Sequence, residues 1–330
     1  MQLYRITLQL HGHFVTALKG DTLFGQFCWA YREKFGKTQL ERDILSGYTE
    51  QQPKIIFSDA LSSGYFNLPK YPLSDFAANY DAKRRKELKS KKLIKQEYIF
   101  TDKSISLKDI WLNTLSSNDS SVMALSAKDA HLPTKHEFVQ THNSIHRLMG
   151  STTAGESFTP YDVSNYTFRS LDNKNKPIKQ EVLVDLFVLL DSLIKIETVK
   201  EMLDNIGLTG FGADASIGKG KFDVKDYQAV SFPLAQNSAF SLSPAVPISA
   251  KIKLTNAYYD VFTRFGRHGN LMAHSQQVFK KPVVMMDSGA TIQFAGLAPQ
   301  FIGNGLVNGK NNEHEAFLQA YSILIPFRIE

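Results

Sequence analysis

The stretch GLTGFGADASIGKGKF, residues 207–222, is the most informative part of the sequence about the fold, because it joins a predicted helix to a predicted strand. Five of the 20 glycines fall within residues 207–220. Glycine reaches positive φ angles and allows close approach of other groups. Successive N–H groups in such a loop can hold a phosphate, and Lys219 and Lys221 add positive charge. An ordinary flexible connection between a helix and a strand explains the same composition equally well.

Two known nucleotide-binding patterns do not fit this loop. A Walker loop has four residues between its glycines and a Ser or Thr after its lysine, whereas five residues separate Gly212 from Gly218, and Gly220 follows Lys219. A dinucleotide fingerprint follows a strand and opens a helix, but this loop follows a helix and opens a strand. We therefore expect no nucleotide cofactor.

The segments on either side of the loop have clear secondary-structure patterns. Apolar residues recur at helical spacing between residues 192 and 206, which predicts a helix that stops at Gly207. Residues 182–190, VLVDLFVLL, are almost entirely apolar, which indicates a central strand covered on both faces. Residues 221–228 are predicted to form the next strand.

The N-terminal residues supply the other elements of the same unit. Polar and apolar residues alternate over residues 4–11, which predicts a strand with one buried face. A helix that begins at Gly20 or Asp21 follows, and residues 55–57 form another strand. The order β-α-β, insertion, β-β-α-β resembles a split-βαβ, or ferredoxin-like, domain.

These patterns divide the chain into two predicted domains. Residues 1–230 form the first domain, and an insertion at about 79–140 interrupts it. Prolines mark a new unit from about residue 231, and residues 231–330 have mostly the pattern of strands separated by turns. We therefore predict an α+β protein.

Positive charge is concentrated in one part of the insertion. The whole chain has 38 basic and 32 acidic side chains, a net charge of +6. Residues 83–95 alone hold eight basic side chains and one acidic side chain. Such a segment attracts polyanions by releasing their counterions, although a solvated surface has this composition just as often. The sequence leaves open whether RNA or an acidic protein is the partner.

Two further segments combine cations, imidazoles and aromatic rings. Residues 142–147, HNSIHR, include Arg147, which can hold a phosphate or stack on a base. Residues 264–270, RFGRHGN, suit a turn against a nucleic-acid backbone, although solvated charges at a hairpin tip are the commoner outcome. Four aromatic side chains could stack on unpaired bases, although several of them are equally plausible core residues: Tyr31, Phe211, Phe222 and Phe265.

The sequence lacks the common catalytic and metal-binding patterns. Its one cysteine, Cys28, lies on the apolar stripe of the first helix, which excludes a disulfide framework and indicates a structural thiol. There is no HExxH motif and no convincing aspartate cluster, so we expect neither a metal site nor metal-dependent activity. No apolar run is long enough to span a bilayer and no signal-peptide core opens the chain, so we expect a cytoplasmic protein.

Together, these segments resemble the RAMP superfamily of CRISPR effector proteins. The resemblance rests on residues 19–25, KGDTLFG, on residues 57–60, FSDA, on residues 143–147, NSIHR, and on the glycine-rich loop. The closing segments 289–294 and 303–305 also fit. The pattern is most similar to the Cas five-like group, and within it to the fourth subunit of type III-A (Csm) effector complexes.

The resemblance implies two ferredoxin-like (RRM-like) domains, a glycine-rich loop and a protruding insertion. It further implies a non-catalytic subunit of an antiviral complex that holds the repeat-derived 5′ handle of the crRNA. The expected partners are that RNA, the large polymerase-like subunit and the adjacent backbone RAMP subunit, without a membrane. The residues expected to bind RNA are Lys19, Asn143, His146, Arg147, Gly210, Gly212, Ser216, Gly218, Lys219, Gly220, Lys221, Arg264, Arg267 and His268.

Two other functions remain open on the sequence. An active RAMP endoribonuclease that processes precursor crRNA would need a histidine as general base and a cation to stabilise developing charge. The candidate histidines are His11, His13, His142 and His146. The second alternative is an RNA-binding module unrelated to CRISPR. Incubation with repeat RNA distinguishes the enzyme from a binding protein, because only the enzyme leaves a defined cut.

Overall fold

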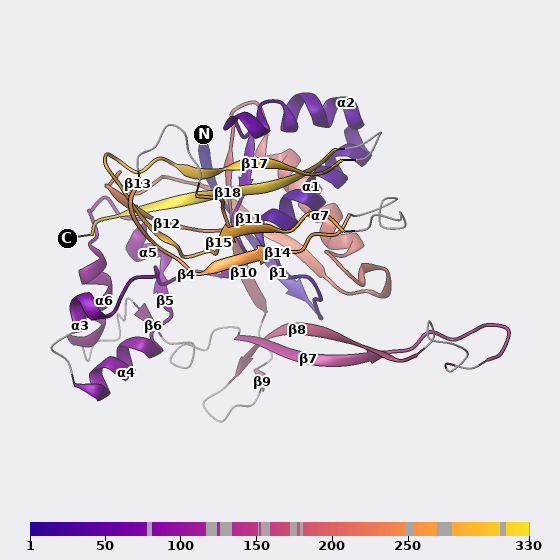
Figure 1. Ribbon diagram of the computed structural model, residues 1–330, viewed down its shortest axis with the longest axis horizontal. Coiled ribbons are helices and arrows are strands. Elements are labelled where there is room, and N and C mark those ends of the chain that lie inside the picture. Colours follow the sequence, from indigo (N-terminus) through magenta and orange to yellow (C-terminus); the bar gives the residue numbers. More distant parts are fainter. Residues whose placement is uncertain are drawn as a thin grey trace.

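The protein is an α+β molecule whose sheets are antiparallel (Figure 1). The computed structural model describes residues 1–77, 81–116, 124–125, 134–150, 152, 159–171, 177–178, 181–247, 254–268, 279–310 and 315–329. Its helices are α1 (Gly20–Phe35), α2 (Lys37–Leu40), α3 (Ser74–Ala77), α4 (Ala82–Ser90), α5 (Gln96–Ile99), α6 (Leu107–Ser116) and α7 (Ile196–Thr209).

The first sheet is built from strands far apart in the sequence. Its order is β11-β1-β10-β2, and β3 also pairs with β10. Because β10 has neighbours on both edges and is buried from Val184 onwards, the predicted central strand is confirmed. Helix α1 follows β1 and helix α7 follows β10, so the chain alternates strand and helix as the sequence predicts. These strands are β1 (Gln2–His11), β2 (Ile55–Phe57), β3 (Leu61–Ser62), β10 (Val182–Leu190) and β11 (Lys221–Val230).

Helix α7 is longer than the sequence predicts. It continues through Gly207 to Thr209 and ends at Gly210, which has a positive φ of 106° and donates its N–H to the carbonyl of Ile206. The prediction that Gly207 stops the helix is therefore wrong. Gly207 is needed for packing instead, because a Cβ there would lie 2.0 Å from the carbonyl oxygen of Phe222 on β11.

The second half of the chain is mostly sheet, as predicted. A five-stranded sheet has the order β13-β16-β12-β18-β17, and β14 pairs with β15 in a separate ribbon. Within the described residues after 230, this half contains strands and no helix. The strands are β12 (Ser238–Ser241), β13 (Leu254–Tyr258), β14 (Val261–Arg264), β15 (Val283–Met286), β16 (Thr291–Phe294), β17 (Phe301–Lys310) and β18 (Glu315–Phe327).

The two large sheets share one hydrophobic core. Strand β18 packs against α1 and β2, and its residues Tyr321 and Phe327 belong to the same buried cluster as the first sheet (Figure 1). The side chain of Gln319 joins the sheets directly, because it accepts a hydrogen bond from the N–H of Phe57 at 2.9 Å and donates to its carbonyl at 2.7 Å. The first sheet therefore depends on the second for part of its core.

Two small sheets lie between β3 and β10 in the sequence. One consists of β4, β5 and β6, and the other of β7, β8 and β9. The β7–β8 hairpin projects from the body of the molecule at the right of Figure 1, whereas α4 lies at its lower left. No helix in the described parts of the chain has the length and apolar character needed to cross a bilayer. The strands are β4 (Tyr65–Asn67), β5 (Leu93–Lys95), β6 (Ala124–Leu125), β7 (Thr134–His142), β8 (Tyr161–Leu171) and β9 (Pro177–Ile178).

Candidate nucleic-acid interface

The connection between β1 and α1, residues 12–19, contacts both the β7–β8 hairpin and the glycine-rich loop. Phe14 and Tyr166 on β8 exchange two backbone hydrogen bonds of 2.8 Å, which fixes the β7–β8 hairpin to this connection. The hydroxyl of Thr16 accepts a hydrogen bond from the N–H of Ala213 in the glycine-rich loop at 2.9 Å. The hairpin and the loop are therefore held against the same short stretch of chain.

Three glycines of the loop are required by close packing. Gly210, Gly212 and Gly220 have positive φ angles of 106°, 79° and 74°. A Cβ on Gly212 would lie 2.3 Å from the Cβ of Thr16, and one on Gly220 would lie 2.2 Å from the carbonyl oxygen of Phe211. These glycines let the loop fold onto its neighbours rather than open toward solvent.

Gly218 differs from these three glycines and provides the cleaner test of the loop. It is exposed, and a Cβ there would meet nothing within 4 Å, although its φ of 91° still disfavours a side chain. We expect Gly220→Val to lower the thermal midpoint of unfolding by several degrees because it clashes with backbone. Gly218→Val should cost less stability and should weaken RNA binding. Thermal melts and an RNA titration on both variants check this, and equal destabilisation would contradict it.

The backbone N–H groups at the base of the loop are already hydrogen bonded. Phe211 donates to Gly220 at 2.9 Å, and Gly220 donates to His13 at 2.8 Å. Lys221 donates its ammonium group to the carbonyl of Leu208 near the end of α7. The base of the loop therefore does not present these groups to a phosphate, whereas residues 216–218 at its tip are exposed.

Lys219 ties the loop to the hairpin. Its side chain is buried and its ammonium group donates to Asn165 on β8 at 2.7 Å and to Asp214 at 3.0 Å. The same nitrogen lies 3.4 Å from Nε2 of His142 at the end of β7. A buried cation with three polar neighbours fixes the position of the elements around it. Sequence reasoning missed Asn165 and Asp214, which carry no motif of their own.

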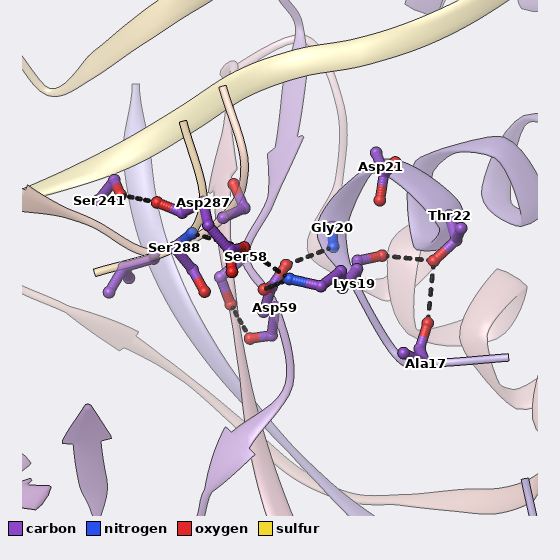
Figure 2. Close-up of polar contacts among 12 residues, drawn as sticks. Ala17, Lys19, Gly20, Asp21, Thr22, Ser58, Asp59, Ser241, Asp287 and Ser288 are labelled. Atoms are coloured by element: carbon purple, nitrogen blue, oxygen red, sulfur yellow. Dashed lines mark hydrogen bonds and ion pairs between the residues drawn. The ribbon is translucent and has the colours of Figure 1, made fainter. Parts of the chain in front are cut away.

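Lys19 lies in a second cluster, which is half-buried, at the start of α1. Figure 2 shows its ammonium group between two carboxylates, Asp59 at 3.1 Å and Asp287 at 2.9 Å. Asp59 also accepts the N–H of Gly20 at 2.9 Å, at the positive end of the helix dipole. Because Asp287 lies between β15 and β16, this cluster fastens the first sheet to the second half of the chain.

The charges of this cluster shift the pKa values of its members. Burial alone would lower the pKa of Lys19, but Asp59 and Asp287 outweigh it and raise the pKa. Burial alone would raise the pKa of Asp287, but the hydrogen bond and charge of Lys19 lower it. The pKa of Asp59 is raised because its burial outweighs the charge of Lys19.

These shifts predict a pH dependence of stability. A lysine with a raised pKa stabilises the fold below its unfolded pKa, and this stability is lost as the pH rises through the folded pKa. An aspartate with a lowered pKa stabilises the fold above its unfolded pKa, and this is lost as the pH falls through the folded value. Between pH 9 and pH 12, the free energy of unfolding should therefore fall less for Lys19→Met than for the wild type. Urea unfolding at several pH values measures both. Identical alkaline slopes would contradict the ion pairs.

Arg264 is paired in the same region. Its guanidinium group donates to both carboxylate oxygens of Asp21, at 2.5 and 2.7 Å, and the Asp21 side chain is fully buried. Both Arg264 and Lys19 lie over the ring of Phe262, at 4.8 and 4.6 Å. Two of the cations expected to bind phosphate are therefore engaged by carboxylates at the join between the two halves.

The remaining residues of the RFGRHGN segment are divided between surface and interior. Arg267 is exposed and lies 4.8 Å above the ring of Phe279. His268 packs against Gly309 of β17, where a Cβ would come within 2.9 Å of its ring. Burial lowers the pKa of His268, and the charge of Lys280 lowers it further. Residues 269 and 270 lie outside the described part of the chain.

The loop that follows β7 presents the NSIHR motif on the projecting hairpin. Asn143 and Arg147 are exposed, and His146 turns the chain by accepting the N–H groups of Met149 and Gly150 at its carbonyl. Beside Arg147, Leu148 is 94% exposed. This part of the interface therefore combines a solvent-facing cation with exposed apolar side chains.

Three of the four aromatic side chains named for base stacking are buried. Tyr31, Phe211 and Phe222 are buried, so of the two roles open on the sequence they are core residues and do not stack on RNA. Phe265 is 71% exposed and is free of the core. Tyr31 and Phe222 face inward from α1 and β11, and Phe211 lies in the glycine-rich loop, where its backbone N–H donates to Gly220 at 2.9 Å.

The described residues offer no assembled metal site. Among them, no group of three or more His, Cys, Asp or Glu side chains is placed to hold a metal ion. Cys28 packs against the hydrophobic core, and burial raises the pKa of its thiol. Such a thiol stays protonated and acts as a structural residue.

This protein resembles known proteins in its structure and not in its overall sequence. No protein-family model matches the sequence, and no curated protein has a matching sequence. Among solved structures, a chain of a Csm1–Csm4 cassette in complex with cA4 is similar with a TM-score of 0.55 and 12% identity, over 100% of this chain and 99% of that one. The cassette in complex with pppApA gives 0.54 at the same identity and coverage. The Csm3–Csm4 subcomplex of the type III-A CRISPR-Cas interference complex gives 0.52 at 14% identity, over 99% and 100%.

The chain therefore has an α+β fold that is also found in these complexes. Csm4 is the component that both kinds of complex contain, and this chain resembles it over its whole length. The resemblance that the sequence motifs indicate is thereby confirmed at the level of the fold.

Proposed function

We propose that this protein is a non-catalytic RNA-binding subunit of a type III-A CRISPR effector complex and that it holds the 5′ handle of the crRNA. The observation that carries the proposal is the whole-length likeness in fold to the chain common to the Csm1–Csm4 and Csm3–Csm4 complexes. The candidate interface adds chemistry suited to RNA, because the hairpin and the glycine-rich loop that contact the β1–α1 connection carry an exposed cation, an exposed amide and exposed glycine backbone.

The expected site residues take two roles in this proposal. Residues that are at least partly exposed contact the RNA, and residues held by ion pairs, hydrogen bonds or close packing fix the elements that present them. The residues proposed to contact RNA are Asn143, His146, Arg147, Ser216, Gly218, Arg267 and, at the interface edge, His268. The residues proposed to position the interface are Lys19, Gly210, Gly212, Lys219, Gly220, Lys221 and Arg264.

The proposed partners are a large polymerase-like subunit and an adjacent backbone RAMP subunit. Csm1 and Csm3 accompany Csm4 in the solved complexes that this chain resembles in fold. Co-expression with candidate subunits from the same genome tests the docking, because a true partner should co-purify in fixed proportion. Within the cell such a complex would act in the cytoplasm.

The proposal also includes two ferredoxin-like domains, residues 1–230 with an insertion at about 79–140, and residues 231–330. The order β11-β1-β10-β2, with α1 and α7 as connections, supports the first of them. Limited proteolysis tests the boundary, since a cut near residue 231 should leave two fragments that stay associated through their common core.

Replacing Arg147 is expected to weaken RNA binding without affecting the fold. Arg147 is exposed on the projecting hairpin, so Arg147→Ala removes a phosphate contact and little packing. The slope of log affinity against log salt should fall by about 0.7, the value for one contact on a single strand. The measurement is a titration of labelled handle RNA and of a scrambled RNA at two salt concentrations. If Arg147 holds a phosphate, both RNAs should lose affinity about equally.

The matched control is Lys195→Ala. Lys195 is exposed at the opposite end of α7 from the glycine-rich loop. The substitution Lys195→Ala therefore removes one positive charge, as Arg147→Ala does, but away from the interface. It should leave the salt slope unchanged. Wild-type protein should also prefer the handle over the scrambled RNA, because contacts to base edges discriminate between sequences. Equal affinity for both RNAs, in the chain alone and in the assembled complex, would contradict handle recognition.

One observation favours a second candidate function, an endoribonuclease. Nε2 of His142 lies 3.4 Å from the ammonium group of Lys219, so an imidazole and a cation are adjacent in the candidate interface. This pairing fits a general base beside a group that stabilises charge. A defined cut in repeat RNA that disappears in His142→Ala, and in RNA with a 2′-deoxy substitution at the cut, would support the enzyme.

A further inference from the structure

Helix α4 is a strongly basic surface outside the candidate interface. It is nine residues long, Ala82–Ser90, and only Leu88 among them is buried. Its exposed cations point around the helix rather than along one side, because neighbouring positions differ by about 100°. They are Lys83, Arg84, Arg85, Lys86 and Lys89.

The charges of α4 are poorly balanced within the helix. Glu87 is its single acidic residue, and Glu87 lies 3.8 Å from Arg84. The first turn holds basic residues and no acidic one, which opposes the helix dipole and is offset only in part by the carboxylate of Asp81 at the N-cap. Like charges three and four residues apart repel each other as well. A bound polyanion would relieve both unfavourable terms.

The helix is nevertheless held in a defined place. The side chain of Asp81 caps it by accepting the N–H of Arg84 at 2.7 Å, and Leu88 anchors it in the main core. The chain then enters β5 directly, and the carbonyl of Lys92 accepts the N–H of Leu68 at 2.8 Å. The cations are therefore carried on a structured support next to the β4–β5–β6 sheet.

We infer that α4 binds the phosphate backbone of a nucleic-acid strand. A protein partner fits less well, because protein interfaces have an apolar core and are depleted in lysine. The exposed side chains of α4 are charged or small and polar apart from Ala82, so the helix offers no such core. A flexible strand of phosphates can instead follow cations around several sides of a helix.

This contact differs from the one proposed at the glycine-rich loop. In Figure 1, α4 lies at the lower left, and the β7–β8 hairpin and the end of α7 lie toward the right along the longest axis. A strand bound at α4 is therefore a separate stretch of nucleic acid or a separate molecule. Because phosphates carry no sequence information, binding at α4 should be independent of sequence, and it does not depend on handle recognition.

The test neutralises the five cations of α4 and measures binding of a labelled 30-nucleotide uridine homopolymer. Glutamine keeps the helix propensity and volume close to those of lysine and arginine. The salt slope should fall by about 0.7 for each cation that contacts a phosphate, and affinity at low salt should fall at least about tenfold. The variant carries Lys83→Gln, Arg84→Gln, Arg85→Gln, Lys86→Gln and Lys89→Gln.

A matched variant separates clustering from net charge. It removes the same five charges at scattered surface positions and should change the salt slope much less. Its substitutions are Lys37→Gln, Lys54→Gln, Lys195→Gln, Lys200→Gln and Lys225→Gln. A third variant keeps the charge of α4 and should bind as well as the wild type; it carries Lys83→Arg, Lys86→Arg and Lys89→Arg. Far-UV circular dichroism confirms that all three variants are folded.

Three outcomes would overturn the inference. The first is an unchanged salt slope in the α4 variant, and the second is an equal loss in the scattered variant. The third is tighter binding of polyglutamate than of the homopolymer, which would identify an acidic protein as the partner. Preference for the handle over a scrambled RNA should survive in the α4 variant, so failure of this inference and failure of the proposed function give different results.

Discussion

Replacing Arg264 by methionine is expected to lower the free energy of unfolding by about 3–5 kcal/mol. The guanidinium group of Arg264 makes two hydrogen bonds to Asp21, whose side chain is fully buried. Removing one partner of a buried pair leaves a charge without compensation, which is the most costly way to break it. Urea unfolding of the full chain, followed by far-UV circular dichroism, measures the loss.

Arg267→Met is the matched control. Arg267 is three residues away, exposed, and stacked on Phe279, so its loss should change stability by less than about 1 kcal/mol. The double variant Arg264→Met, Asp21→Leu should recover part of the lost stability, because no unpaired carboxylate remains. If Arg264→Met keeps its stability but loses RNA binding, Arg264 is an RNA ligand rather than a structural residue.

Gly207→Ala is expected to destabilise the protein by about 1–3 kcal/mol, although alanine is the better helix former. In an open helix this change gains up to about 1 kcal/mol. At Gly207 the added Cβ would lie 2.0 Å from the carbonyl oxygen of Phe222, which is backbone and cannot rotate away. Helix α7 would have to move off β11, and overpacking of this kind outweighs the helix propensity.

Gly25→Ala is the matched control and is expected to stabilise the protein. Gly25 lies inside α1, where a Cβ would meet nothing within 4 Å. It should raise the free energy of unfolding by about 0.4–1 kcal/mol. Denaturation midpoints of the two variants that shift in the same direction would contradict the close packing of α7 on β11.

Much of the first sheet could be predicted from the sequence because its patterns are local. The apolar run at residues 182–190 and the alternation at 4–11 identify two neighbouring strands, and both are found. The close packing of Gly207 could not be predicted, because a glycine at the end of a helical pattern usually ends the helix. Only the neighbouring strand, which brings Phe222 against it, decides otherwise.

The candidate interface was harder to predict because the deciding contacts are long-range. Lys19 and Arg264 look like phosphate ligands in the sequence, but their carboxylate partners, Asp287 and Asp21, lie 268 and 243 residues away. No local spacing reveals such pairs. The residues that surround Arg147 in the sequence do not show whether it has a carboxylate partner. The sequence therefore cannot separate cations that face solvent from cations that hold the fold together.

The hydrogen bonds between Gln319 and Phe57 affect how the chain can fold while it is being translated. The two residues lie 262 positions apart, and β18 completes the core over α1. At about 5–20 residues per second, a ribosome needs on the order of 10–50 s to synthesise the intervening chain. During that time the nascent N-terminal half displays the apolar face that β18 will later cover. Chaperone dependence should therefore be greatest for partly synthesised chains, and a chain truncated before Glu315 should aggregate.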